Sequence, residues 1–210
     1  MDKITFRNVE QQDLATLCAI IKETWDCDEF IKDEQVLKAA IQVYLNQVLL
    51  ASSYGKVAVL DGEVVGVIFA SIKGEDLIYR LLVESEMENI FVLMNADESD
   101  KASFIEYMYK LDSSYEELIV NRAQDYDGTL QFLALSPKAR GKGVGKLLWQ
   151  TLHTYLKEKE IASIYVYTDN GCNFEFYDYQ GFARVDTKEV VMKFGDEAES
   201  MEIYLYDFQV

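Results

Sequence analysis

The feature of the sequence that most constrains its fold is an apolar segment that runs directly into a basic, glycine-rich turn. Residues 129–135 are predicted to form a buried strand and residues 143–160 a helix. The turn between them reads Arg140-Gly141-Lys142-Gly143-Val144-Gly145-Lys146. A helix start presents free N–H groups and partial positive charge, and glycine lets the backbone approach an anion closely. The segment therefore predicts a phosphate-binding turn at a strand-to-helix junction.

Two widespread phosphate-binding patterns do not fit this turn. The P-loop pattern GxxxxGK[ST] requires Ser or Thr at the position of Leu147, and the dinucleotide pattern GxGxxG requires glycine at the position of Lys146. These departures argue against NAD and against a doubly wound fold. The pattern that remains is Arg or Gln, two residues, Gly, one residue, and Gly or Ala. It is filled by Arg140, Gly143 and Gly145.

A second motif follows one helix and one strand later. After a predicted strand at residues 163–168 come Asn170, a short helix that contains Phe176-Tyr177, and the pair Gly181-Phe182. In this order, the two motifs resemble those of the GCN5-related N-acetyltransferase (GNAT) superfamily. The resemblance covers residues 56–72 and 129–194 well, and the N-terminal helices in order only. A glycine-rich helix start of another origin would explain the first motif but not both together.

The resemblance implies a single α/β domain over residues 1–210, with a mixed, largely antiparallel sheet that splays between its fourth and fifth strands. The pantetheine arm of acetyl-CoA would enter this gap beside the backbone of Leu133, Ala134 and Leu135. Asn170 would contact the same arm. The pyrophosphate would lie on the N–H groups of the glycine-rich turn, which are those of Arg140, Gly141, Lys142, Gly143, Val144, Gly145 and Lys146.

The same resemblance implies an N-acetyltransferase in which a primary amine attacks the thioester of acetyl-CoA directly. Tyr177 would lie near the thioester sulfur and donate a proton to the departing thiolate. A backbone N–H near Leu135 would stabilise negative charge on the carbonyl oxygen. Cys172 lies close by in the sequence, but no histidine accompanies it, so we expect a packed thiol rather than a nucleophile.

Periodicity and turn residues predict the remaining elements. The Asp61-Gly62 pair predicts a hairpin. Two helices at 77–95 and 101–122 form an insertion of about residues 76–125, whose apolar faces would pack on the domain, cover the acceptor cleft or form a homodimer surface. The other expected elements are strands at 4–9, 56–60, 64–72, 182–194 and 201–208, and helices at 14–24, 33–50 and 173–179.

Composition narrows the partners. A formal net charge of −17 disfavours nucleic acid and anionic membranes and favours a small cationic amine as acceptor. The chain shows neither an apolar signal core nor a run of about 18 apolar residues, so a cytoplasmic protein is expected. Three cysteines and the single His153 give no metal-ligand pattern, and His153 is expected to be structural.

The general base is not singled out by the sequence. Members of the family often carry a carboxylate on or near the fourth strand, where this chain offers only Gln131. Asp127 lies just before that strand, and a loop between the first two helices supplies further candidates, which are Asp26, Asp28 and Glu29. Two other classes stay open: a sensor that binds acyl-CoA without turnover, and a protein-interaction module that works through its inserted helices.

Overall fold

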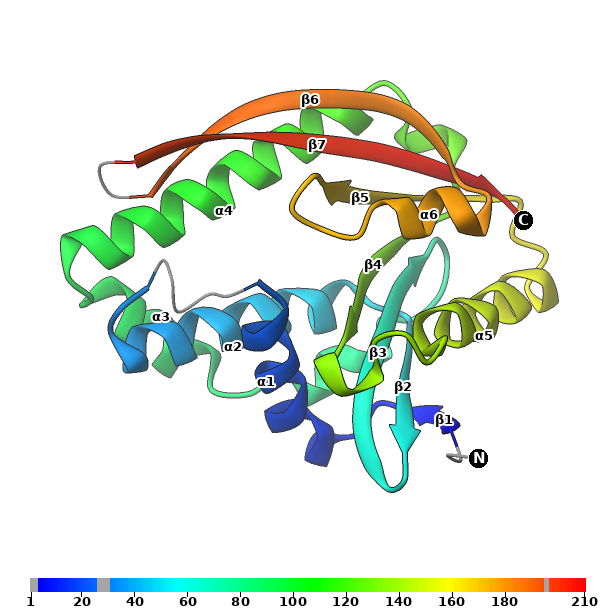
Figure 1. Ribbon diagram of the computed structural model, residues 1–210, viewed down its shortest axis with the longest axis horizontal. Coiled ribbons are helices and arrows are strands. Elements are labelled where there is room, and N and C mark those ends of the chain that lie inside the picture. The colour runs from blue at the N-terminus through cyan, green and yellow to red at the C-terminus, as the bar shows by residue number, and fades with distance from the viewer. Residues whose placement is uncertain (1–3, 26–30, 195–196) are drawn as a thin grey trace.

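One sheet organises the part of the chain that the computed structural model describes, which is residues 4–25, 31–194 and 197–210 (Figure 1). Its seven strands lie in the order β1-β2-β3-β4-β5-β7-β6. Every neighbouring pair is antiparallel except β4 and β5, which are parallel. The mixed, largely antiparallel sheet is therefore confirmed. The strands are β1 (Ile4–Asn8), β2 (Tyr54–Leu60), β3 (Glu63–Ile72), β4 (Gly128–Leu135), β5 (Ser163–Asp169), β6 (Ala183–Phe194) and β7 (Glu197–Gln209).

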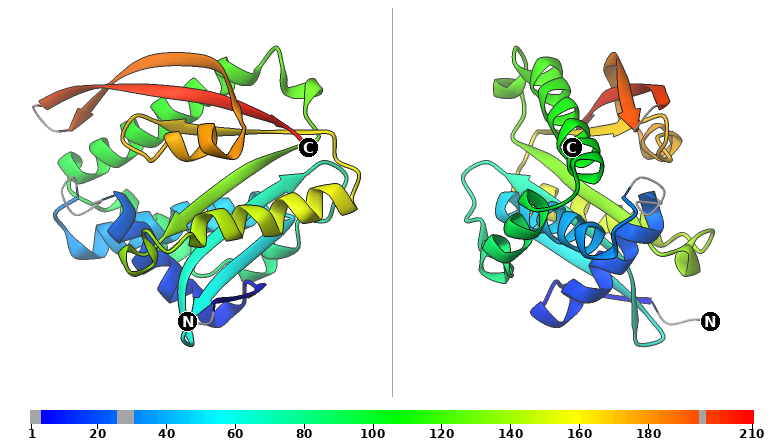
Figure 2. Two further views of the ribbon diagram at one scale, coloured as in Figure 1. Left: turned by 45° about the vertical axis from the view of Figure 1, so that its right-hand side comes forward. Right: turned by 90° about the vertical axis from the view of Figure 1, so that its left-hand side faces the viewer.

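Helices cover both faces of the β1–β4 half of the sheet (Figures 1 and 2). Helices α1 (Leu14–Trp25) and α2 (Glu34–Ala51) lie on one face, and α5 (Val144–Glu158) lies on the other. Successive side chains of a strand point to opposite faces, so β3 supplies both cores. Val67 and Phe69 pack with α1 and α2, whereas Ile68 packs with α5. Both cores hold the sheet in place around the strand-to-helix junction.

The insertion between β3 and β4 differs in part from its prediction. The expected helix over 77–95 is a 3-10 turn, η3 (Ile78–Leu82), followed by α3 (Glu86–Met94). The two are separated at residues 83–85, where Ser85 has a φ of 47°. The side chain of Asn46 in α2 donates a hydrogen bond of 2.9 Å to the carbonyl of Glu84, so this carbonyl serves α2 rather than a continuous helix.

The second inserted helix runs along the C-terminal half of the sheet. Helix α4 (Glu98–Ile119) begins and ends three residues before the expected 101–122, and a short turn, η4 (Ala123–Asp125), leads into β4. Its side chains Leu111 and Leu118 pack against Met192, Ile203 and Leu205 of β6 and β7. Helix α4 thus covers an apolar face of the long β6–β7 ribbon that would otherwise be exposed to water. None of the helices in the described residues has the length and apolar character of a membrane span.

Strands β4 and β5 pair at one end only. The pairs are Gly128 with Ile164 and Thr129 with Tyr165. Beyond them β4 carries one extra residue, Gln131, because Leu130 pairs with Ala70 and Phe132 with Phe69 of β3. Such a bulge bends a strand and increases its twist. The sheet therefore splays between its fourth and fifth strands, as the sequence predicted.

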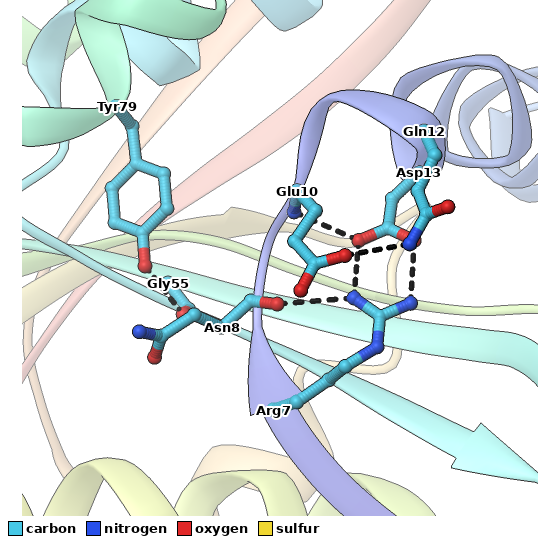
Figure 3. Close-up of polar contacts among 7 residues, drawn as sticks. All are labelled: Arg7, Asn8, Glu10, Gln12, Asp13, Gly55 and Tyr79. Carbon is cyan, nitrogen blue, oxygen red and sulfur yellow. Dashed lines mark hydrogen bonds and ion pairs between the residues drawn. The ribbon is translucent and has the colours of Figure 1, made fainter.

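A polar network fixes the start of α1 against β1 (Figure 3). Arg7 donates to both carboxylate oxygens of Asp13, at 2.6 and 2.7 Å, and the N–H of Glu10 donates to the same carboxylate at 2.9 Å. Nearby, the Tyr79 hydroxyl donates to the carbonyl of Gly55 at 2.8 Å. Because Asp13 is only 3% exposed, this anchor holds α1 at a defined angle and so places Trp25 at its far end.

Candidate active site

The glycine-rich turn forms an uncapped helix start at the end of β4. Gly143 is the N-cap of α5 and has a φ of 74°, and Gly141 has a φ of 73°. As a glycine, this N-cap has no side chain that could accept a hydrogen bond from the helix N–H groups. A Cβ on either glycine would meet no protein atom within 4 Å. Glycine is needed here for its positive φ, and the space beside the turn is open to a ligand.

Local charge at this turn agrees with an anion site. The side chains of Arg140, Lys142 and Lys146 are all exposed around the start of α5. The N–H groups of the first helical residues have no acceptor within their own helix, because the first intrahelical bond runs from Leu147 to the carbonyl of Gly143. Peptide dipoles and cationic side chains thus act on the same place, which suits a pyrophosphate.

The splayed edge of β4 offers backbone groups to the gap. The N–H of Ser136 donates to the carbonyl of Val65 in β3, at 2.9 Å. Peptide groups alternate in direction along a strand. The N–H and C=O of Leu133 and Leu135 therefore point away from β3 and toward the gap. Ala134 pairs with Val67 of β3, so this alternation turns its backbone groups away from the gap.

Tyr177 lies in α6 (Glu175–Gln180) and is 8% exposed. Its ring lies 5.4 Å from that of Phe182 and 5.8 Å from that of Tyr206. Burial raises the pKa of the Tyr177 phenol well above its ordinary value, with smaller contributions from Cys172 and Asp169. The hydroxyl is therefore protonated at neutral pH and can donate a proton.

The turn, the edge of β4 and α6 meet at Gly145. A Cβ built on this glycine would lie 3.3 Å from Leu135 Cδ1 and 3.5 Å from Phe176 Cε2. Phe176 immediately precedes Tyr177 in α6. The structure therefore brings together the predicted phosphate turn, the predicted edge of β4 and the helix of the predicted acid.

Asn170 is exposed just beyond the end of β5 and binds the neighbouring strand. Its backbone N–H donates to the carbonyl of Glu202 at 3.0 Å, and its side-chain oxygen accepts from the N–H of Glu202 at 3.1 Å. These bonds continue the β5–β7 ladder. The contact of Asn170 with a cofactor arm stays a prediction.

Asp127, the candidate base that the structure describes, lies away from the gap. The carboxylate of Asp127 accepts hydrogen bonds from the N–H groups of Ala162, at 2.8 Å, and Ser163, at 3.1 Å. These bonds hold β4 to β5 at their paired end, opposite the end where the gap opens. We therefore assign Asp127 a structural role. The other candidates, Asp26, Asp28 and Glu29, lie outside the described residues.

Sequence reasoning missed the aromatic side chains at the open end of the gap. The rings of Trp25, Tyr44 and Phe132 lie 5.4 to 5.9 Å apart. Tyr115 of α4 stacks on Tyr167 of β5 with ring centroids 4.2 Å apart. We call these five rings the aromatic mouth. Part of the insertion thus reaches the site, whereas η3 and α3 leave apolar side chains exposed, namely Ile78, Leu81, Met87, Phe91 and Met94.

Asp169, the last residue of β5, was also missed. Its carboxylate accepts from the N–H of Gly171 at 2.8 Å and from the thiol of Cys172 at 3.5 Å. Burial raises the pKa of Asp169, although these hydrogen bonds oppose the shift. Alternation along β5 places Tyr165, Tyr167 and Asp169 on one face. The sequence shows this period, but the candidate bases that it suggested were Asp127 before β4 and the carboxylates after α1.

Two other groups behave as expected. Burial, followed by the neighbouring Asp169, raises the pKa of Cys172 to about 12, so it stays a thiol at neutral pH. His153 stacks on Trp149 of α5 with ring centroids 5.6 Å apart, and burial, followed by Lys157, lowers its pKa. Within the described residues, no three His, Cys, Asp or Glu side chains gather in a way that could hold a metal.

This chain matches one family model and a set of solved structures. The model of the acetyltransferase (GNAT) family matches residues 17–182. A search of the curated proteins found no match. Solved structures of low sequence identity share the fold across nearly the whole chain.

Three of these structures illustrate the range. A mutant of agmatine N-acetyltransferase in its apo form is 16% identical, with a TM-score of 0.60 over 99% of this chain and 100% of that one. Ribosomal-protein-alanine N-acetyltransferase from Brucella melitensis is 15% identical, with a TM-score of 0.56 over 98% and 99%. PaiA N-acetyltransferase from Thermoplasma acidophilum, in complex with coenzyme A, is 17% identical, with a TM-score of 0.54 over 99% of both chains.

Proposed function

The chain belongs to the acetyltransferase (GNAT) family, and on that premise we propose that it transfers the acetyl group of acetyl-CoA to a primary amine of a small acceptor. The observation that carries the proposal is the meeting of three parts at Gly145. An uncapped, basic helix start, a strand edge with backbone groups directed into a gap, and the helix of a buried tyrosine lie within contact of one another.

The backbone binds the cofactor in this proposal. The helix start, with Arg140, Lys142 and Lys146 around it, holds the pyrophosphate. The N–H and C=O groups of Leu133 and the C=O of Leu135 bind the amide groups of the pantetheine arm as a strand would. Gly141 and Gly143 leave room beside the turn, since no protein atom lies within 4 Å of where their Cβ atoms would be.

Acetyl-CoA supplies a thioester whose carbonyl carbon the amine attacks directly. The N–H of Leu135 donates to the carbonyl oxygen as negative charge develops on it. Tyr177, which is protonated at neutral pH, donates a proton to the leaving sulfur. Because both substrates are held together, positioning supplies much of the rate.

The acceptor in this proposal is a small amine that carries positive charge in solution. The net charge of −17 gives the protein a negative field that attracts cations. The aromatic mouth adds ring faces, which attract ammonium groups. A screen of primary amines identifies the group that is attached to the amine nitrogen.

Binding of coenzyme A tests the proposal first. A ligand that binds only the folded state raises stability by about 2.7 kcal/mol at a hundredfold excess over its dissociation constant. We expect millimolar coenzyme A to raise the melting temperature, and Gly143→Val to abolish most of that rise. An unchanged melting temperature of the wild-type protein would contradict the proposal.

A matched control separates binding from backbone strain. Gly62 has a φ of 90° and, like Gly143, no atom within 4 Å of an added Cβ, but it lies in the β2–β3 hairpin. Gly62→Val should lose a similar amount of stability and keep the full response to coenzyme A. Release of free thiol on addition of a primary amine then distinguishes an enzyme from an acyl-CoA sensor.

A further inference from the structure

The open end of the gap holds a carboxylate that the proposed function leaves without a role. Asp169 ends β5 where β4 and β5 have diverged, and its side chain is partly buried. It lies on the same face of β5 as Tyr167, whose ring belongs to the aromatic mouth. Asp169 is therefore a carboxylate beside aromatic rings, at the end of the gap where an acceptor would meet the thioester.

Contacts through Cys172 connect Asp169 to the Trp25, Tyr44 and Phe132 part of the aromatic mouth. The thiol of Cys172 donates to Asp169 Oδ2 at 3.5 Å. Burial raises the pKa of the Cys172 thiol, and the side chain of Trp25 lies close enough to lower it in part. Trp25 in turn contacts Tyr44 and Phe132 through ring faces and edges. A short chain of contacts thus joins the carboxylate of β5 to α1, α2 and β4 across the gap.

Titratable groups from several elements surround Asp169. Tyr115 of α4 interacts electrostatically with Asp169, Cys172, Tyr44 and Tyr107. Tyr177 of α6 interacts with Asp169, Cys172 and Tyr44. Tyr115, Tyr177 and Cys172 are neutral at physiological pH because burial raises the pKa of each. Among these described groups, Asp169 is therefore the one that carries charge.

The other carboxylates near β4 are placed differently. Asp127 is bound by two backbone N–H groups at the paired end. Glu23 of α1 lies near the end of β4, where it accepts from the hydroxyl of Ser136 at 3.4 Å, but its side chain is exposed. Water screens an exposed carboxylate, whereas a partly buried one binds a cation more strongly.

Building on the proposed acetyl transfer, we infer that Asp169 binds the ammonium group of the acceptor and takes its proton. The acceptor class that follows is a small primary amine whose charged nitrogen enters between the ring faces of the aromatic mouth and ends at one carboxylate. Such a site selects amines that carry an aliphatic or aromatic group next to the nitrogen over highly hydrated, compact cations, because the rings displace water from the entering carbon atoms.

The proton balance of the reaction is complete with Asp169 and Tyr177. Asp169 takes one proton from the ammonium group, and the freed lone pair forms the C–N bond to the thioester carbon. The C–S bond breaks as Tyr177 donates its proton to the sulfur. The second proton lost by the nitrogen returns to Tyr177, and Asp169 releases the first to solvent. A poorly hydrated site favours this transfer, because the neutral amine and carboxylic acid cost less desolvation than the ion pair.

The test compares Asp169→Asn with Asp127→Asn and Glu23→Gln in the full-length protein. Thiol release from acetyl-CoA is measured across a screen of primary amines that includes hexylamine, phenethylamine and 1,4-diaminobutane. We expect Asp169→Asn to lower kcat/KM by about a hundredfold, the low end of general acid-base effects, and to keep the response to coenzyme A. The two control variants should keep kcat/KM within about threefold of wild type.

A pH profile adds a readout that a structural role would not change. Because burial raises the pKa of Asp169, kcat/KM of the wild-type protein should fall as pH drops through that raised value, and Asp169→Asn should remove this limb. The native state holds the proton of Asp169 more tightly than the unfolded state, so its ionisation costs stability as pH rises. Asp169→Asn should therefore melt at the same temperature as wild type or higher at neutral pH.

Three results would overturn the inference. The first is an Asp169→Asn variant with wild-type kcat/KM and an unchanged acidic limb. The second is a lower melting temperature or a lost response to coenzyme A in that variant, which would make Asp169 structural. The third is an equal loss of activity in Glu23→Gln. If the wild-type protein binds coenzyme A but releases no thiol with any amine, the proposed function fails instead, and the inference with it.

Discussion

The two ends of the β4–β5 pair use the same kinds of residue in opposite ways. At the paired end, Asp127 binds the N–H groups of Ala162 and Ser163, and the hydroxyl of Ser163 donates to the carbonyl of Asp125 at 2.9 Å. At the open end, Asp169 lies against a thiol and aromatic rings, and burial raises its pKa. Asp127 accepts hydrogen bonds from the neighbouring strand, whereas Asp169 accepts one from Gly171 in its own turn and lies beside aromatic rings.

On the proposed function, a single pair of strands separates stability at one end from chemistry at the other. Hydrogen bonds to backbone N–H groups satisfy polar groups that would otherwise be buried without partners. A partly buried carboxylate with a raised pKa raises the free energy of the folded state at neutral pH but can bind a cation. Substitutions at the paired end should therefore act on unfolding, and those at the open end on turnover.

Gly128→Ala should have the largest effect, a loss in the free energy of unfolding, because Gly128 lies in the paired end itself. An added Cβ would lie 2.5 Å from the carbonyl oxygen of Ser71 and 2.8 Å from Ile72 Cδ1. Forcing an atom into a packed site of this kind costs about 3 kcal/mol. Urea unfolding followed by circular dichroism measures the loss. A loss below about 1 kcal/mol would mean that the packing around Gly128 relaxes to fit the new atom. The contrast between the two ends of the pair would then weaken.

Tyr177→Phe tests the open end. It removes one hydroxyl and keeps the ring, so packing against Phe182 should survive. We expect kcat to fall about a hundredfold, which corresponds to about 2.7 kcal/mol in the barrier, with little change in affinity for coenzyme A. Steady-state kinetics and calorimetry measure the two quantities separately.

A control for this variant lies in the same helix. Tyr179 is 82% exposed, so Tyr179→Phe should leave kcat unchanged. Wild-type kcat in Tyr177→Phe would reduce Tyr177 to a packed aromatic side chain.

Asp127→Asn should have the smallest effect and sharpens the comparison with Asp169→Asn. An asparagine oxygen still accepts a hydrogen bond but lacks the charge, so we expect a loss of about 1 kcal/mol in the free energy of unfolding. The position of β5 and kcat/KM should change little. A loss of turnover without a loss of stability would place Asp127 in the reaction and undo the assignment of roles.

Much of the fold could be predicted because its signals are local. Asp33 caps α2 through bonds to the N–H groups of Gln35 and Val36, and Asp61-Gly62 forms the hairpin turn between β2 and β3. The strand-to-helix turn and the later Tyr177 motif indicated the family and, through it, the splayed sheet. In each case, residues close together in the sequence determine the backbone conformation.

The remainder depends on contacts between distant residues. The bulge at Gln131 is defined only by the register of β4 against β3. The break before α3 follows from a bond between Asn46 and Glu84. The surroundings of Asp169 come from helices α1, α2, α4 and α6. Periodicity could place Asp169 on a face of β5, but not beside Trp25 or Tyr115.

The short junction between β4 and β5 has a mechanical consequence. The two halves of the sheet are joined laterally by the pairs of Gly128 with Ile164 and Thr129 with Tyr165. Strands rise about 3.3 Å per residue, so the far end of β4 lies about 20 Å from this junction. A rotation of only about 3° there would shift the far end by about 1 Å, a misplacement that can cost about a hundredfold in rate. Small residues at the junction, such as Gly128, therefore set the separation of the far ends of β4 and β5, which they never touch.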